Sequence, residues 1–175
     1  MVLYHATTAK RAKKILEIGI IKRNTDRFYT EELNGEGYST DGYVYLSNEI
    51  TYAMYFANCH TLVDKSESIY VFKMEIDDSW LEADYDEIRH ESVSKEELSR
   101  YNSDLEYTLM QFMACRVSND LFLKELSAEY CIVPKNGKEK LIDIIGKVGA
   151  DYDYTIHHYT ALQKRYLRSI KWYKI

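Results

Sequence analysis

A histidine, a tyrosine and a glutamate occupy three short segments whose patterns suit chemistry. His5 lies near the end of an alternating segment that predicts a strand, directly before a helical pattern begins. Tyr45 lies in a second expected strand, where alternation places it on the same face as Ser47. Glu129 interrupts a third, largely apolar strand, where a carboxylate is costly unless it is solvated, paired or functional. The flat apolar face and hydrogen-bonding tip of tyrosine suit a cleft that binds a ring, and the imidazole of His5 is titratable.

Taken singly, each residue also has a plainer explanation. His5 fits a capping or core imidazole, Tyr45 and Tyr55 fit packing residues, and Glu129 fits an edge-strand charge that discourages pairing. The order of the three segments on their expected elements favours the functional interpretation.

The elements that would position these groups follow from periodicity and from turn signals. Strands are expected at 2–7, 43–47, 69–76, 128–133, 141–145 and 169–175, and a further strand is expected to begin at 20–21. Helices are expected from Ala9 to the stop at Gly19, from Ile50 onward, and at 105–117, 121–126 and 151–168. Residues 24–42 predict a long polar loop, and 77–103 predict surface helix and loop. Because strands and helices mix without regular βαβ alternation, we expect an α+β fold.

Composition sets the class of protein. The chain has 175 residues, which predicts a single domain over 1–175, and 46% apolar content excludes a disordered chain. A net charge of -5 disfavours a chain-wide phosphate-binding surface. Three cysteines without CxxC spacing, and no apolar stretch near the length of a membrane span, predict a reduced, soluble, cytoplasmic protein with no membrane partner.

Several common site classes lose their main support. The sequence has no GxGxxG, GxxxxGK[ST], GxSxG or HExxH motif, which disfavours Rossmann, P-loop, α/β-hydrolase and zincin sites. His157 and His158 are adjacent on an expected helix and point about 100° apart, so they cannot easily grip one metal. Cys59 and His60 lack a second ligand pair at finger spacing. We expect no metal.

The three segments together resemble the ADP-ribosyltransferase superfamily, in its His-Tyr-Glu branch, which includes diphtheria toxin and the poly(ADP-ribose) polymerases. His5-Ala6-Thr7 resembles the branch's His-Gly-Ser/Thr strand, and Val44-Tyr45-Leu46-Ser47 followed by Ala53-Met54-Tyr55 resembles its second segment. Glu129-Tyr130-Cys131-Ile132-Val133 is similar to its glutamate strand. The matched segments span residues 2–133, and the resemblance implies a split, mixed or antiparallel sheet with flanking helices.

The resemblance also implies roles in the cleavage of NAD⁺, which serves as the ADP-ribose donor. His5 would bind a ribose hydroxyl, the Ala6 backbone would hold the nicotinamide carboxamide, and Thr7 would add a hydroxyl. Tyr45 and Tyr55 would sandwich the nicotinamide ring, with Ser47 in the same pocket. Glu129 would bind the ribose 2′-OH and stabilise the oxocarbenium-like transition state.

This sequence departs from the family pattern at some positions. Ala6 replaces the usual glycine, which is tolerated where the backbone has a negative φ. Tyr43 competes with Tyr45, and Tyr52 competes with Tyr55, for the nicotinamide pocket.

The expected function is NAD⁺-dependent mono-ADP-ribosylation of a macromolecule by a small effector or toxin. A protein acceptor is favoured over a nucleic acid, and Arg23 and Arg27 could meet a phosphate. The alternatives are a catalytically silent module that binds NAD⁺ or ADP-ribose, and an α+β interaction protein in which the three residues coincide by chance. The sequence leaves the acceptor and the oligomeric state open.

Overall fold

The computed structural model describes residues 1–24, 39–137, 140–145 and 160–175. Within these ranges an antiparallel sheet of seven strands forms the centre of the molecule, in the order β5-β6-β3-β1-β4-β8-β9. The strands are β1 (Val2–Thr8), β3 (Val44–Ser47), β4 (Ser68–Glu75), β5 (Glu82–Ala83), β6 (Ala114–Val117), β8 (Glu129–Pro134) and β9 (Tyr173–Lys174). A separate ribbon joins β2 (Ile20–Ile21) to β7 (Leu121–Phe122). The predicted α+β class is confirmed.

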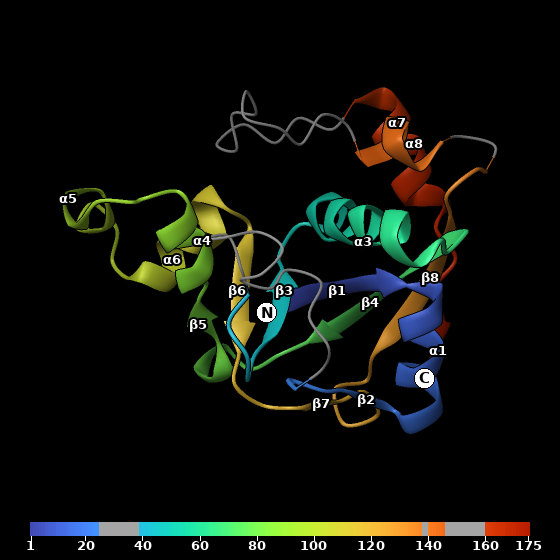
Figure 1. Ribbon diagram of the computed structural model, residues 1–175, viewed down its shortest axis with the longest axis horizontal. Coiled ribbons are helices and arrows are strands. Elements are labelled where there is room, and N and C mark those ends of the chain that lie inside the picture. The colour runs from blue at the N-terminus through green and yellow to red at the C-terminus, as the bar shows by residue number, and fades with distance from the viewer. Residues whose placement is uncertain (25–38, 138–139, 146–159) are drawn as a thin grey trace.

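Helices cover both faces of the sheet (Figure 1). On one face lie α3 (Ile50–Asp64), α7 (Leu141–Ile145) and α8 (Ala161–Ser169), over a core that includes Ile69, Val71, Cys131 and Val133. On the other face α1 (Ala9–Ile18) packs on a core that includes Leu3, Phe72 and Met74. The short elements η1 (Asp78–Trp80), α4 (Tyr85–His90), α5 (Lys95–Leu98) and α6 (Asp104–Gln111) follow β4. Strand alternation therefore supplies two cores from one sheet.

The centre of the sheet opens between β1 and β3. Strand β1 pairs with β4 from Val2↔Glu75 to Thr8↔Ile69, whereas its register with β3 is Tyr4↔Ser47. Beyond Tyr4, the edge of β1 that faces away from β4 has no strand partner among the described residues. This divergence leaves room between two strands that carry His5 and Tyr45.

The expected N-terminal elements are present, including the helix stop at Gly19, whose φ of 73° lies in the left-handed region. The α3 stripe is also confirmed, because Ile50, Ala53, Met54 and Ala57 are all buried. The loop over 24–42 and the helix over 151–168 lie partly outside the described residues.

Three expected elements are wrong. The helix predicted over 105–117 ends at Gln111, and after Met113, with a φ of 52°, the chain enters β6 instead. The helix predicted over 121–126 is β7 followed by turns. The strand predicted over 141–145 is α7, which buries Leu141, Ile144 and Ile145. Short apolar runs do not distinguish a buried strand from a buried helix. Strand pairing accounts for β6 and β7, and packing in the core accounts for α7.

The β4 core position Ile69 should contribute strongly to stability because its side chain is fully buried. We expect Ile69→Ala to lower the free energy of unfolding by about 2 to 5 kcal/mol, through lost burial and the cavity left behind. Ile132→Ala is the matched control, since that side chain is 43% exposed on the adjacent strand, and it should cost less than half as much. Urea denaturation measures both, and equal losses would contradict this account of the core.

Candidate functional site

A cavity of about 1140 Å³ lies where β1 and β3 diverge, and helices α1, α3 and α4 also contribute to its walls. Its lining includes six residues expected from the sequence: His5, Ala6, Thr7, Tyr45, Ser47 and Tyr55. Their segments are separated by up to 50 residues in the chain, and the fold brings them to one hollow. The rival tyrosines Tyr43 and Tyr52 line the same cavity.

His5 is held at the point where the two strands separate. Its Nδ1 lies 3.1 Å from the backbone oxygen of Tyr45, within hydrogen-bond distance. A side chain of β1 thus contacts the backbone of β3 in the region where strand pairing has ended. The contact holds the His5 imidazole beside Tyr45.

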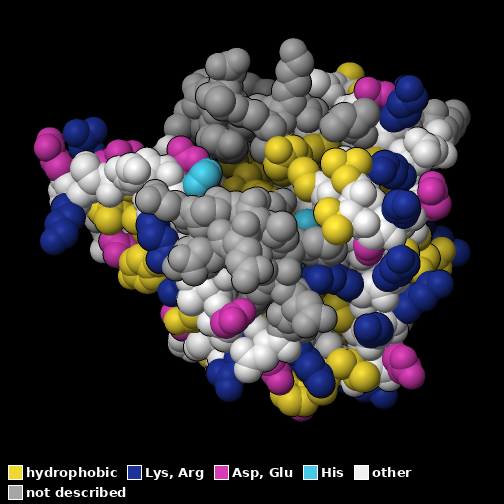
Figure 2. All heavy atoms as spheres, in the orientation of Figure 1, with side chains coloured by type: hydrophobic (Ala, Val, Ile, Leu, Met, Phe, Trp, Pro, Cys, Tyr) yellow, Lys and Arg dark blue, Asp and Glu magenta, His cyan; other side chains and the backbone are white. Residues whose placement is uncertain are grey.

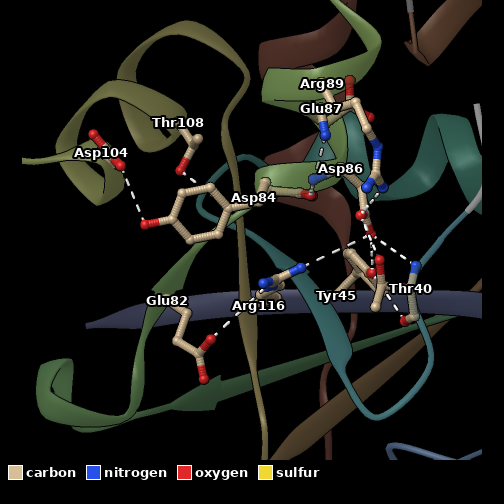
Figure 3. A network of polar contacts seen from close by, with 11 residues as sticks. Thr40, Tyr45, Glu82, Asp84, Asp86, Glu87, Arg89, Asp104, Thr108 and Arg116 are labelled. Carbon is tan, nitrogen blue, oxygen red and sulfur yellow. Dashed lines mark hydrogen bonds and ion pairs between the residues drawn. The ribbon is translucent and has the colours of Figure 1, made fainter. Parts of the chain in front are cut away.

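The phenol of Tyr45 belongs to a polar network that joins β3 to α4 and β6 (Figure 3). Its hydroxyl donates to Asp86 Oδ2, and the backbone oxygen of Thr40 lies 3.1 Å from that hydroxyl. Arg89 and Arg116 also approach the Asp86 carboxylate, at 2.5 Å and 3.9 Å. The network fixes the position of the Tyr45 ring at the cavity wall.

The two tyrosines at 43 and 45 are held in different ways. The Arg116 guanidinium lies over the Tyr43 ring, 3.8 Å from its centroid, which is a cation–π contact. Tyr45 is fixed through its hydroxyl. Both tyrosines line the cavity.

Helix α3 forms an aromatic wall of the cavity. Tyr52, Tyr55, Phe56, Cys59 and His60 recur at helical spacing and line it, while Ile50, Met54 and Ala57 face the core. The Tyr52 and Phe56 rings pack edge to face at 4.9 Å, and Tyr52 is 8% exposed. Tyr55 is the more accessible of the rival pair.

His60 places an uncharged imidazole in the same wall. Burial, together with the nearby charge of Arg11 and the neighbouring His5, lowers the pKa of His60 to about 4. The ring is therefore neutral near pH 7.

The predicted catalytic role of Glu129 is not supported by the geometry. Glu129 lies on β8, which β4 separates from β1, and it is not part of the cavity lining. Three strand spacings separate β8 from the strand of Tyr45, about 14 Å across the sheet. The carboxylate forms an ion pair with Lys73, directly opposite it on β4. Its charge in a largely apolar strand is explained by this cross-strand pair.

Acidic residues at the start of α4 line the cavity instead, and the sequence had indicated only surface helix there. They are Asp84, Asp86 and Glu87. The Asp84 side chain accepts hydrogen bonds from the backbone N–H groups of Asp86 and Glu87, as an N-cap does. The spacing D-x-x-E marks such a helix start and was a usable signal, but it does not report burial.

The three carboxyl groups have different electrostatic environments. Burial raises the pKa of Asp84 to about 6. Burial also raises the pKa of Glu87, to about 7, and the charges of Asp84, Glu91 and Asp86 add to this effect. Burial would raise the pKa of Asp86 too, but hydrogen bonds from Thr40 and Tyr45 outweigh it and hold the pKa below its usual range.

Basic residues line the cavity where α1 and β2 form its wall. They are Arg11, Lys14 and Lys22, and the acidic Glu17 of α1 lines the same wall. Figure 2 shows several lysine and arginine side chains on the side of the molecule where α1 lies. The cavity therefore has basic residues on one wall, acidic residues on another, and tyrosines on β3 and α3.

The structure also bears on the residues that the sequence raised as metal ligands, phosphate contacts and membrane segments. Among the described residues, no group of three His, Cys, Asp or Glu side chains could hold a metal ion, and His157 and His158 lie outside them. Arg23 donates to the backbone oxygen of Ser118 at 2.5 Å, and Arg27 lies outside the described residues. No helix in the described part of the chain is long and apolar enough to cross a membrane.

Comparisons with known proteins add no assignment: no protein-family model, no curated protein and no solved structure matches the chain significantly.

The raised pKa of Glu87 predicts a pH dependence of stability. Between its ordinary value of 4.5 and about 7, the folded chain keeps a proton that the unfolded chain has released. The free energy of unfolding contributed by this group therefore falls as pH rises through that window. Glu87→Gln should remove the decline and leave the protein more stable by on the order of 2 kcal/mol at pH 8, with little difference at pH 4.

Urea denaturation of wild type and variant across pH 4 to 8 measures this difference. Taking the difference also cancels the opposing contribution of His60, whose lowered pKa makes stability rise with pH below about 6.5. Glu96→Gln, an exposed carboxyl on α5, is the control and should leave the pH profile unchanged. Parallel curves for wild type and Glu87→Gln would contradict the stated environment of Glu87.

Proposed function

We propose that this protein is an NAD⁺-dependent mono-ADP-ribosyltransferase, with the fold of the family that its sequence resembles. The observation that carries the proposal is the convergence of His5, Ala6, Thr7, Tyr45 and Tyr55 on one cavity. The resemblance assigns these residues to NAD⁺, and of the residues it assigns only Glu129 lies outside the cavity. A cavity of about 1140 Å³ is large enough for a dinucleotide, since it slightly exceeds the usual range for small-molecule sites.

The distribution of charge in the cavity supports this ligand. NAD⁺ carries a diphosphate at its centre and a positive charge on the nicotinamide ring. Arg11, Lys14 and Lys22 would bind the diphosphate, and the acidic start of α4 would favour the cationic ring and the positive charge that develops on its ribose. The nicotinamide would stack between Tyr45 and Tyr55.

The reaction breaks the bond between the nicotinamide nitrogen and ribose C1′. The electron pair of that bond leaves with neutral nicotinamide, a new bond joins C1′ to the acceptor nucleophile, and the nucleophile's proton is released. His5 would orient the ribose through a hydroxyl, and the β1 backbone at Ala6, along the edge that β3 leaves open, would hold the carboxamide. No metal is required in this scheme.

A protein acceptor is favoured over a nucleic acid, as the net charge of -5 disfavours a nucleic-acid surface. A silent module that binds NAD⁺ or ADP-ribose is the second candidate, because Glu129 lies outside the cavity. Labelled NAD⁺ incubated with cell extract separates these possibilities: label removed by protease indicates a protein acceptor, and label removed by nuclease indicates a nucleic acid. Binding without nicotinamide release indicates the silent module.

Tyr55→Ala should weaken NAD⁺ binding about tenfold, which corresponds to the loss of one aromatic stacking contact. His5→Ala should weaken binding and reduce nicotinamide release. Calorimetry measures the Kd, and chromatography of released nicotinamide measures turnover.

Tyr173→Ala and Glu129→Gln are the controls, because neither side chain lines the cavity, and both should bind and turn over NAD⁺ as wild type does. A wild-type protein that neither binds NAD⁺ nor releases nicotinamide would overturn the proposal.

A further inference from the structure

We propose that Glu87 is the carboxyl group that serves the reaction at this site, in the place that the sequence assigned to Glu129. The inference rests on the proposed function and names a further catalytic residue for it. It assigns the role to the first turn of α4, an element that the resemblance to known transferases does not involve.

The first argument is position. Glu87 lines the cavity that also contains His5, Tyr45 and Tyr55, whereas Glu129 does not. Asp86 precedes Glu87 directly, and its carboxylate accepts from the Tyr45 hydroxyl. Figure 3 shows Glu87 on the helix turn next to this contact. The network that holds Tyr45 therefore also fixes the turn that carries Glu87.

The second argument is that the three acidic residues of the cavity wall at the start of α4 have different partners. Asp84 caps α4 through two backbone N–H groups, and Asp86 binds Thr40, Tyr45 and two arginines. Both carboxylates therefore bind other groups of the protein at the cavity wall. Among the described residues, no hydrogen bond or ion pair reaches the Glu87 carboxyl, and its half-buried side chain lines the cavity. A carboxylate that lines the cavity and has no protein partner is available to the positive charge that develops on the ribose.

The third argument is chemical. When the C1′–N bond breaks, the ionised Glu87 carboxylate would stabilise positive charge on the ribose. The carboxylate would then take a proton from the nucleophile, which is either the acceptor group or water, as the nucleophile's oxygen bonds to C1′. It would pass that proton to solvent. A general base works best when its pKa is close to the working pH, and burial brings Glu87 to about 7.

The groups around Glu87 predict how the rate depends on pH. Asp86 on its own helix, and Asp84 and Glu91 at the two caps of that helix, favour the protonated form. Arg116 from β6 and Tyr45 from β3 contact Asp86, His90 lines the same cavity, and His60 on α3 is neutral. Because Glu87 acts as a carboxylate, kcat/KM for NAD⁺ should fall as pH drops below about 7.

Purified full-length wild type and Glu87→Gln test this inference, with nicotinamide release and NAD⁺ affinity measured from pH 5 to 9. Glu87→Gln should lower kcat about 10²- to 10³-fold, the usual scale for one electrostatic contact in a transition state. Its Kd for NAD⁺ should stay within about threefold of wild type, and its acid limb should disappear. A thermal melt at pH 8 confirms folding, since this variant should be at least as stable as wild type there.

Glu91→Gln is the matched control, at the C-cap position of the same helix and outside the cavity. Since the Glu91 charge raises the pKa of Glu87, this variant should keep the plateau rate and move the acid limb to lower pH. A Glu87→Gln protein with wild-type kcat and acid limb, beside an inactive Glu129→Gln, would overturn the Glu87 assignment and leave the proposed function intact. A wild type without nicotinamide release would overturn both.

Discussion

The site depends on one constraint, the unequal pairing of the two edges of β1. Along one edge the strand pairs with β4 from Val2 to Thr8, which holds it rigidly in the sheet. Along the other edge its register with β3 is Tyr4↔Ser47, and the two strands then diverge. The contact from His5 Nδ1 to the Tyr45 backbone oxygen lies at the divergence. A central opening in an otherwise continuous sheet can hold a ligand against backbone and side chains together.

The charged residues are distributed unevenly among the walls of this opening. Helix α1 contributes Arg11 and Lys14 together with one acidic residue, Glu17, the first turn of α4 contributes carboxyl groups, and α3 contributes aromatic rings. The Asp86 network ties α4 to both β3 and β6, so the acidic wall is fixed relative to the tyrosines. A molecule with an anionic centre and a cationic ring matches this order, whereas a uniformly charged ligand would meet repulsion from one wall.

Strong local patterns made much of the fold predictable. Alternation identified β1, β3, β4 and β8, and the apolar stripe identified α3, because in each case local propensity and burial agree. Three residues that these patterns singled out, His5, Tyr45 and Tyr55, line one cavity. Sequence could not locate Glu129, because its distance from Tyr45 depends on strand order, and β4 lies between β1 and β8. Glu87 was missed because an acidic helix looks solvated until the pairing of β5 with β6 and the Asp86 network place α4 against the opening.

The orientation of NAD⁺ in this opening is the central claim, and a crystal structure with a non-cleavable NAD⁺ analogue tests it most directly. The account predicts the nicotinamide ring between Tyr45 and Tyr55, the ribose beside His5 and Glu87, and the diphosphate near Arg11 and Lys14. An analogue bound with its diphosphate against the α4 carboxyl groups, or an empty cavity at saturating concentration, would contradict it.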